Sequence, residues 1–131
     1  MVEYVSIVVV SHTEKIALGI QEMIGQIAEE IVVEVAGGTD DGTVGTSLEK
    51  ITCAINRANS NKGILVFYDM GSAKMNAQFA IEMGEYADVE IVDAPLVEGA
   101  YIAAVKASIG KSASEIKEKL HTFFPDFLQH V

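Results

Sequence analysis

The stretch from Val5 to Ile20 changes its pattern of apolar residues abruptly at Ser11 and His12. Before this point the chain is a run of β-branched residues, which favours a buried strand. After it, apolar residues recur at helical spacing, and Ser11 followed by Glu14 predicts a capping box that starts a helix. A buried strand leading directly into a helix is typical of α/β proteins. We therefore expect His12 at the carboxyl end of a strand, beside the start of a helix.

Three further strands are predicted by similar apolar runs at residues 31–36, 64–68 and 89–94. Helical patterns follow them at about 47–58, 72–84 and 97–109, and a last one covers 113–124. This alternation predicts an α/β fold, in which a single domain over residues 1–131 is a doubly wound parallel sheet of about four strands with helices on both faces. For the common strand order 2-1-3-4, a crevice opens outside the carboxyl ends of the first and third strands.

The predicted helix starts differ in their charge. Thr46 with Glu49, and Ser112 with Glu115, form two further capping-box patterns. The helix that starts at about Ser72 has no carboxylate in its first turn, although an acid there normally stabilises a helix by roughly 0.3–1 kcal/mol. In so acidic a chain, this indicates a helix start kept free for an incoming anion, with chance composition as the alternative.

Composition excludes several classes of partner. The chain has 9 Lys and Arg against 19 Asp and Glu, a formal net charge of −10, which disfavours nucleic acids and anionic membranes. Charged residues interrupt every apolar run well short of a membrane span. No signal peptide is recognisable after Met1, and the single Cys53, expected as a packed thiol, excludes an internal disulfide. We therefore expect a cytoplasmic protein.

Polar residues follow both strands at the predicted crevice. His12 ends the first strand and Asp69 ends the third, with Gly71 and Ser72 directly after it. A carboxylate that accepts a hydrogen bond from one imidazole nitrogen leaves the lone pair of the other free to attack. If the target of this attack is phosphorus, we predict His12 and Asp69 as catalytic residues. Gly71 and Ser72 are then the phosphate-binding residues, at roughly 1.5–3 kcal/mol per charge-assisted hydrogen bond. Lys74 is expected as a solvated lysine, although it could help to receive a phosphate.

From the residues alone, three interpretations of His12, Asp69 and Ser72 stay open. The histidine is a structural residue satisfied by hydrogen bonds, a nucleophile or phosphoryl carrier, or part of a Ser-His-Asp hydrolase. The hydrolase is least favoured, because residues 70–74 lack the second glycine of a G-x-S-x-G elbow. His121 and His130 are expected at the surface without the spacing of a metal site, and we expect no cofactor.

Four segments resemble those of a known family: VVVSHTEKIALGI (8–20), GGTDDGTVGTS (37–47), VFYDMGSAKMNAQFA (66–80) and APLVEGAYIAAVKAS (94–108). The family is that of the mannose-class IIA domains of the bacterial phosphoenolpyruvate-dependent phosphotransferase system. The resemblance is closest to its DhaM branch, the phosphotransferase subunits of dihydroxyacetone kinase. The turn at 69–72 is shorter than the Gly-Gly-Ser loop of the transport branch, and residues 95–99 look like the kinase branch.

The resemblance implies that His12 is phosphorylated on its distal nitrogen by the carrier protein HPr, with Asp69 orienting the ring and Gly71 and Ser72 holding the phosphate. In the kinase branch the phosphoryl group then passes to ADP bound on the L subunit, DhaL. In transport relatives it passes to a IIB domain. A non-catalytic anion-binding docking module is an alternative from a different class.

The resemblance also implies an assembly, because family members are commonly homodimers. The predicted helix at 72–84 carries a second apolar stripe formed by Met75, Phe79 and Met83. This stripe suits either a dimer or docking face, or packing against a neighbouring helix.

Overall fold

The computed structural model describes residues 3–130, with side chains described for residues 3–128. Within these residues it has a four-stranded parallel sheet in the order β2-β1-β3-β4, as expected. The strands are β1 (Ser6–Ser11), β2 (Val33–Gly37), β3 (Ile64–Tyr68) and β4 (Val89–Ile91). The helices are α1 (Glu14–Ile27), α2 (Leu48–Arg57), α3 (Gly71–Gly84), α4 (Leu96–Ser108) and α5 (Ala113–Phe123), followed by a 3-10 helix at Phe127–His130.

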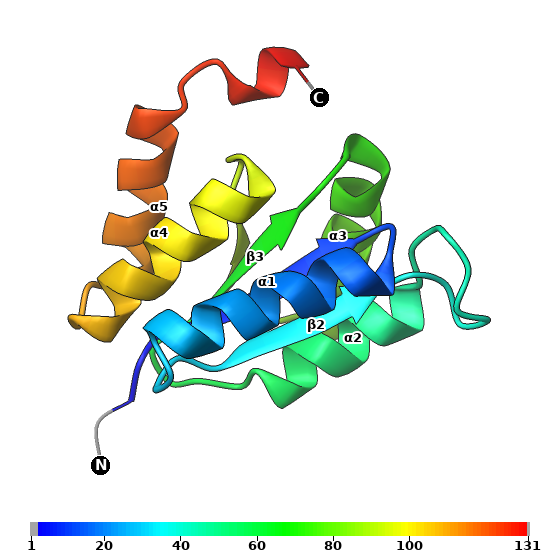
Figure 1. The fold of residues 1–131 in the computed structure, drawn as a ribbon, viewed down its shortest axis with the longest axis horizontal. Helices are drawn as coiled ribbons and strands as arrows, with labels where there is room; N and C mark the ends of the chain where they lie inside the picture. The colour runs from blue at the N-terminus through cyan, green and yellow to red at the C-terminus, as the bar shows by residue number, and fades with distance from the viewer. Residues whose placement is uncertain (1–2, 131) are drawn as a thin grey trace.

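Helices cover both faces of the sheet (Figure 1). Each face has its own apolar core. Ile7 and Val9 of β1 pack with residues of α1, α4 and α5. Val8 and Val10 point to the other face and pack with residues of α2 and α3. Successive side chains of a strand alternate between faces, so a strand buried on both faces reads as an unbroken apolar run. This confirms the predicted doubly wound architecture.

The register of the central strands brings the two predicted site segments together. Val10 of β1 pairs with Tyr68 of β3, so the residues that follow each strand, His12 and Asp69, leave the sheet at the same edge. On the other side of β1, Ser11 pairs with Gly37 at the end of β2. A Cβ atom at Gly37 would lie 2.6 Å from the Cα of Glu14, so only glycine lets β2 end this close to the start of α1.

The free edge of β2 is covered by side chains of the flanking helices. Its three outward-facing carbonyls accept hydrogen bonds from Gln21 of α1 at 2.7 Å, Arg57 of α2 at 3.4 Å and Lys50 of α2 at 3.0 Å. Unpaired backbone groups on an edge strand can pair with another chain. These side-chain donors therefore hinder strand addition at β2.

The cap of α1 differs from the prediction. Thr13, not Ser11, is the N-cap residue, and its Oγ1 accepts from the backbone N–H of Ile16 at 3.2 Å. Ser11 is still part of β1, and its hydroxyl donates to Asp69 at 3.0 Å. The same hydroxyl accepts from the backbone N–H of Thr13 at 3.2 Å, but not from the first turn of α1. The predicted capping box of Ser11 with Glu14 is therefore wrong, because Thr13 takes the cap position.

The cap of α2 is also displaced by one residue. Ser47 accepts from the N–H of Lys50, whereas the predicted Thr46 accepts a hydrogen bond from the Asn76 side chain of α3. The capping box at the start of α5 is confirmed, with Ser112 and Glu115 each bonding the backbone of the other.

Two further predictions need correction. Cys53 is exposed rather than packed, because Ile51 and Ile55 occupy the buried face of α2 and Cys53 lies between them on the outer side. Strand β4 ends at Ile91 instead of Ala94. The side chain of His130 lies outside the described side chains, so its predicted exposure stays a prediction. None of the helices in residues 3–130 combines the length and apolarity that crossing a membrane requires.

Candidate functional site

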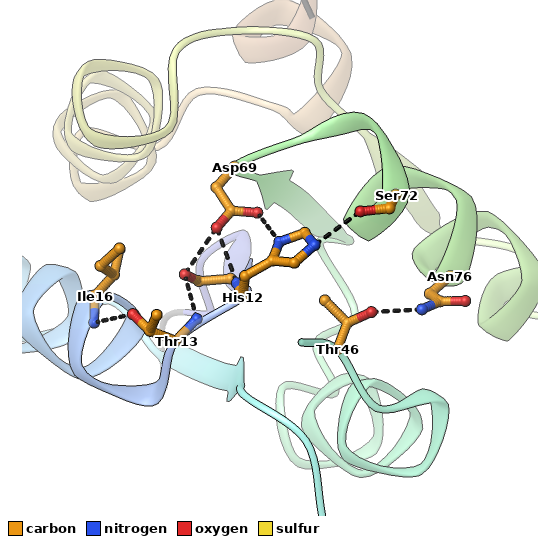
Figure 2. A network of polar contacts seen from close by, with 8 residues as sticks. His12, Thr13, Ile16, Thr46, Asp69, Ser72 and Asn76 are labelled. Atoms are coloured by element: carbon orange, nitrogen blue, oxygen red, sulfur yellow. Dashed lines mark hydrogen bonds and ion pairs between the residues drawn. The ribbon is translucent and has the colours of Figure 1, made fainter. Parts of the chain in front are cut away.

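His12 and Asp69 are joined by two hydrogen bonds at the edge of the sheet (Figure 2). The ring Nδ1 of His12 lies 2.9 Å from Oδ1 of Asp69, and the backbone N–H of His12 donates to Oδ2 at 2.8 Å. The hydroxyl of Ser11 donates to the same Oδ2. Both side chains are largely covered, with 15% of His12 and 16% of Asp69 exposed. The carboxylate thus fixes both the ring and the backbone of His12.

The electrostatics of the pair determine the tautomer of the imidazole. Burial alone raises the pKa of Asp69, but the hydrogen bonds from the backbone and ring of His12 and from Ser11 outweigh burial, so that the pKa lies below its ordinary value of 3.8. Asp69 is therefore ionised at neutral pH and can only accept hydrogen bonds. Consequently, in the neutral ring Nδ1 carries the proton and Nε2 keeps its lone pair.

The free nitrogen of the ring faces the start of α3. Nε2 of His12 lies 2.7 Å from the hydroxyl of Ser72, an exposed residue that donates to it in this tautomer. The N-cap residue Met70 makes no side-chain cap bond, and the first turn of α3 contains no acidic residue, as predicted. Helix geometry leaves the N–H groups of Gly71 and Ser72 without intrahelical acceptors. An anion placed beyond Nε2 would meet these donors and the positive end of the helix dipole.

The loop between β2 and α2 forms the third side of the site. The N–H of Gly45 donates to the carbonyl of His12 at 2.8 Å. Thr46 accepts a hydrogen bond from Asn76 of α3, which ties this loop to the helix that carries Ser72 (Figure 2). Loop and helix are therefore fixed relative to the imidazole.

The structure brings together His12, Asp69 and Ser72, with Gly71 one residue before Ser72 on the same helix start. Sequence reasoning missed the contribution of Ser11, which it assigned to a helix cap. The available signal was its position directly before His12 in a buried strand, where a hydroxyl needs an acceptor on a neighbouring strand. Lys74 is not a solvated lysine either, since its ammonium lies 2.8 Å from Asp93.

Comparisons with known proteins place the chain in a family. The family EIIA-man, described as the PTS system fructose IIA component, matches residues 6–117. The phosphoryl donor subunit DhaM of dihydroxyacetone kinase 2 from Listeria innocua is 40% identical over 120 residues, covering 88% of this chain and 96% of that protein. The DhaM subunit from Lactococcus lactis is 38% identical over 114 residues, covering 87% of this chain and 91% of that subunit.

Two solved structures share the fold. The crystal structure of the unknown-function protein EF1359 superposes with a TM-score of 0.81 at 37% identity, covering 91% of this chain and 94% of the other. The dihydroxyacetone kinase of C. freundii shares the fold alone, with a TM-score of 0.62 at 14% identity over 91% of this chain and 24% of the kinase. From the matched sequence pattern and the relatives of similar length, the chain belongs to the EIIA-man family of phosphotransferase-system IIA components.

Proposed function

We propose that this chain is the phosphoryl donor subunit of a phosphoenolpyruvate-dependent dihydroxyacetone kinase, and that it carries the phosphoryl group on Nε2 of His12. The observation that supports this most directly is the pairing of Nδ1 with Asp69, which leaves the Nε2 lone pair facing the start of α3. The relatives at 35–40% identity over most of the chain carry names of such subunits.

The proposed reaction is an in-line displacement at phosphorus. The Nε2 lone pair of His12 attacks the phosphorus of the donor, the N–P bond forms, and the bond from phosphorus to the donor atom breaks with its electron pair leaving on the donor. The ring becomes positively charged, and the Asp69 carboxylate stabilises it. The hydroxyl of Ser72 and the first N–H groups of α3 then donate hydrogen bonds to the phosphoryl oxygens.

The proposed partners follow from the family resemblance. HPr is the donor, and ADP bound on the DhaL subunit is the acceptor, whose terminal phosphate oxygen attacks phosphorus while the N–P bond breaks. We also propose that the chain is a homodimer and acts in the cytoplasm. In the transport alternative a IIB domain takes the place of DhaL.

The experiment that tests the carrier function is a reconstituted phosphorylation. Incubation with phosphoenolpyruvate, enzyme I and HPr should place one acid-labile, base-stable phosphate on the chain, and His12→Ala should abolish it. His130→Ala, which removes a histidine assigned neither to the site nor to its supporting contacts, is the matched control and should keep the label. A labelled His12→Ala chain would disprove the assignment. Adding purified DhaL with ADP, or a IIB domain instead, then identifies the acceptor.

A hydrolase is the second candidate, because Ser72, His12 and Asp69 are linked in the order of a Ser-His-Asp triad. The two functions differ in their nucleophile: the hydrolase uses the Ser72 oxygen, whereas the carrier uses the His12 nitrogen. A fluorophosphonate probe should leave Ser72 unmodified if the carrier function is correct. Ser72→Ala should slow phosphorylation of His12 without abolishing it. Covalent labelling of Ser72 by the probe would favour the hydrolase.

A further inference from the structure

A second cluster of polar side chains lies behind the site and is used by none of the steps above. It brings together Tyr68 at the end of β3, Lys74 of α3, Asp93 between β4 and α4, and His121 of α5. Asp93 is the shared partner. Its Oδ1 accepts from the hydroxyl of Tyr68 at 2.6 Å and lies 2.8 Å from the ammonium of Lys74.

The backbone of Asp93 is fixed as well. Its N–H donates to Nε2 of His121, the residue predicted at the surface, at 3.1 Å, and the His121 side chain is half-buried. Only 19% of the Asp93 side chain and 23% of the Lys74 side chain are exposed, and Tyr68 is fully buried. Burial raises the pKa of Asp93, but the hydrogen bonds from Lys74 and Tyr68 outweigh it and lower the pKa overall. The carboxylate therefore stays charged at neutral pH.

The two side chains held by Asp93 flank the turn that forms the phosphate end of the site. Tyr68 directly precedes Asp69, and Lys74 follows Ser72 by two residues. One carboxylate oxygen thus ties together both ends of the segment 69–73. Displacement of either end would move Asp69 relative to Ser72. The hydrogen bonds that these two residues make to the His12 ring would then be distorted.

The start of α3 needs such a restraint, because it has no side-chain cap of its own. Helices α1, α2 and α5 are capped by Thr13, Ser47 and Ser112, each of which bonds a backbone N–H in the first turn. Helix α4, like α3, has no side-chain cap bond, but it does not face the imidazole of His12. A cap side chain on α3 that accepted from the N–H of Ser72 would compete with a phosphate for that group. A restraint acting from the opposite side of the turn leaves this group available.

We propose that Asp93 is a positioning residue for the His12 site, which holds the turn between β3 and α3 through Tyr68 and Lys74. The expected change in the rate of phosphoryl transfer rests on the proposed function. The expected change in the geometry of the His12 site does not. Loss of the Asp93 carboxylate should loosen the contact between His12 and Asp69 even in the absence of any phosphoryl donor.

The test compares Asp93→Asn, Asp93→Ala, Tyr68→Phe and Lys74→Met with the wild-type chain. Glu90→Gln is the matched control, because it removes the exposed Lys117–Glu90 ion pair of 3.2 Å on the neighbouring strand. Nitrogen-15 NMR of the His12 ring measures the fraction of the tautomer protonated at Nδ1. Kinetics with phosphorylated HPr measure kcat and KM, and urea unfolding measures stability.

Asp93→Ala should lower the Nδ1-protonated fraction and reduce kcat by about tenfold, because misplaced reacting groups lose orientation, while KM changes little. Asp93→Asn, which keeps an acceptor for Tyr68, should lie between Ala and wild type. If Asp93→Ala does not fold, Tyr68→Phe and Lys74→Met decide the question.

Unchanged ring signals and unchanged kcat in the folded variants would overturn the proposal, whatever their loss of stability. If the wild-type chain accepts no phosphate from HPr, the proposed function fails, and the NMR measurement still tests the positioning role.

Discussion

Asp69 uses its two oxygens for different tasks. Oδ1 binds the ring of His12, whereas Oδ2 accepts from the His12 backbone and from the Ser11 hydroxyl. The first contact sets the tautomer of the imidazole. The other two fix the position of the carboxylate relative to the His12 backbone. A single side chain therefore controls both the proton position and the orientation of the reacting nitrogen.

Asp69→Asn should slow phosphorylation of His12 by on the order of a hundredfold, because the amide neither fixes the tautomer nor stabilises the positively charged ring. The initial rate of labelling from phosphorylated HPr measures this. Asp88→Asn, which removes a charge from the exposed turn before β4, away from the site, should keep the wild-type rate. Equal rates for the two variants would mean that Asp69 is not needed to orient the ring.

The largely covered carboxylates of Asp69 and Asp93 make the free energy of unfolding depend on pH. The pKa values of Asp69 and Asp93 in the folded chain are lowered from 3.8. Each therefore contributes stability that is fully present above the unfolded pKa and is lost as pH falls through the folded pKa. The free energy of unfolding, measured in urea at pH 7, 5, 4 and 3, should fall below about pH 4.

The variant Asp69→Asn/Asp93→Asn should lose less stability between pH 5 and pH 3 than the wild-type chain, since its two amides do not titrate. The matched variant Asp41→Asn should follow the wild-type curve. Parallel curves for the double variant and the wild type would show that the acid sensitivity arises elsewhere.

At the scale of the secondary-structure elements, α3 begins without a side-chain cap at the point where it faces the His12 ring. Its buried face is made of Ala73, Ala77 and Ala80, which lie close to the sheet, and its N-cap residue Met70 makes no side-chain bond. The helix is therefore held by this packing and by the contacts of Lys74 and Asn76 with neighbouring segments. Its first N–H groups face the site.

Met70→Asp should add an N-cap and stabilise the chain by about 1 kcal/mol, because Met70 already has the extended backbone of an N-cap residue. The same carboxylate should slow His12 phosphorylation several-fold, since a like charge a few ångströms from the phosphate costs about 1 kcal/mol or more. Urea unfolding and labelling rates measure the two effects.

The matched variant Gln78→Glu adds an equal charge in the middle of α3, on its exposed side, and should change the labelling rate little. If Met70→Asp and Gln78→Glu slowed labelling equally, overall charge rather than the start of α3 would be the cause.

At the scale of the whole molecule, the outer face of α3 exposes a stripe of three large apolar side chains. Met75, Phe79 and Met83 are 69%, 53% and 64% exposed, so the alternative that they pack against a neighbouring helix is wrong. Helical spacing of three to four residues places them in line with Ser72 at the start of the same helix. This stripe stays the predicted dimer or docking face.

Phe79→Glu should shift the chain from dimer to monomer in sedimentation velocity experiments, because a buried charge without a partner opposes association. Ile109→Glu, which alters another exposed apolar residue directly after α4, should leave the sedimentation coefficient unchanged. A wild-type chain that sediments as a monomer would refute the homodimer, and the stripe would then be tested for binding of HPr.

The order of the elements was readable from the sequence, because strand and helix patterns are set by neighbouring residues: apolar runs in strands buried on both faces, and spacing of three to four residues in helices. The same local patterns placed His12 and Asp69 at strand ends. Parallel pairing of β1 and β3 then required these ends to share one edge.

The partners of the polar side chains were decided by the tertiary structure. Whether Ser11 caps α1 or binds Asp69, and whether Lys74 is solvated or binds Asp93, depends on residues that are distant in the sequence. By local sequence preference, Ser11 would cap a helix. In the folded chain Asp69, which follows the neighbouring strand, is a charged and largely covered acceptor, and such an acceptor binds a hydroxyl more strongly. Such competition is settled only where strands and helices meet, so no pattern along the chain records its outcome.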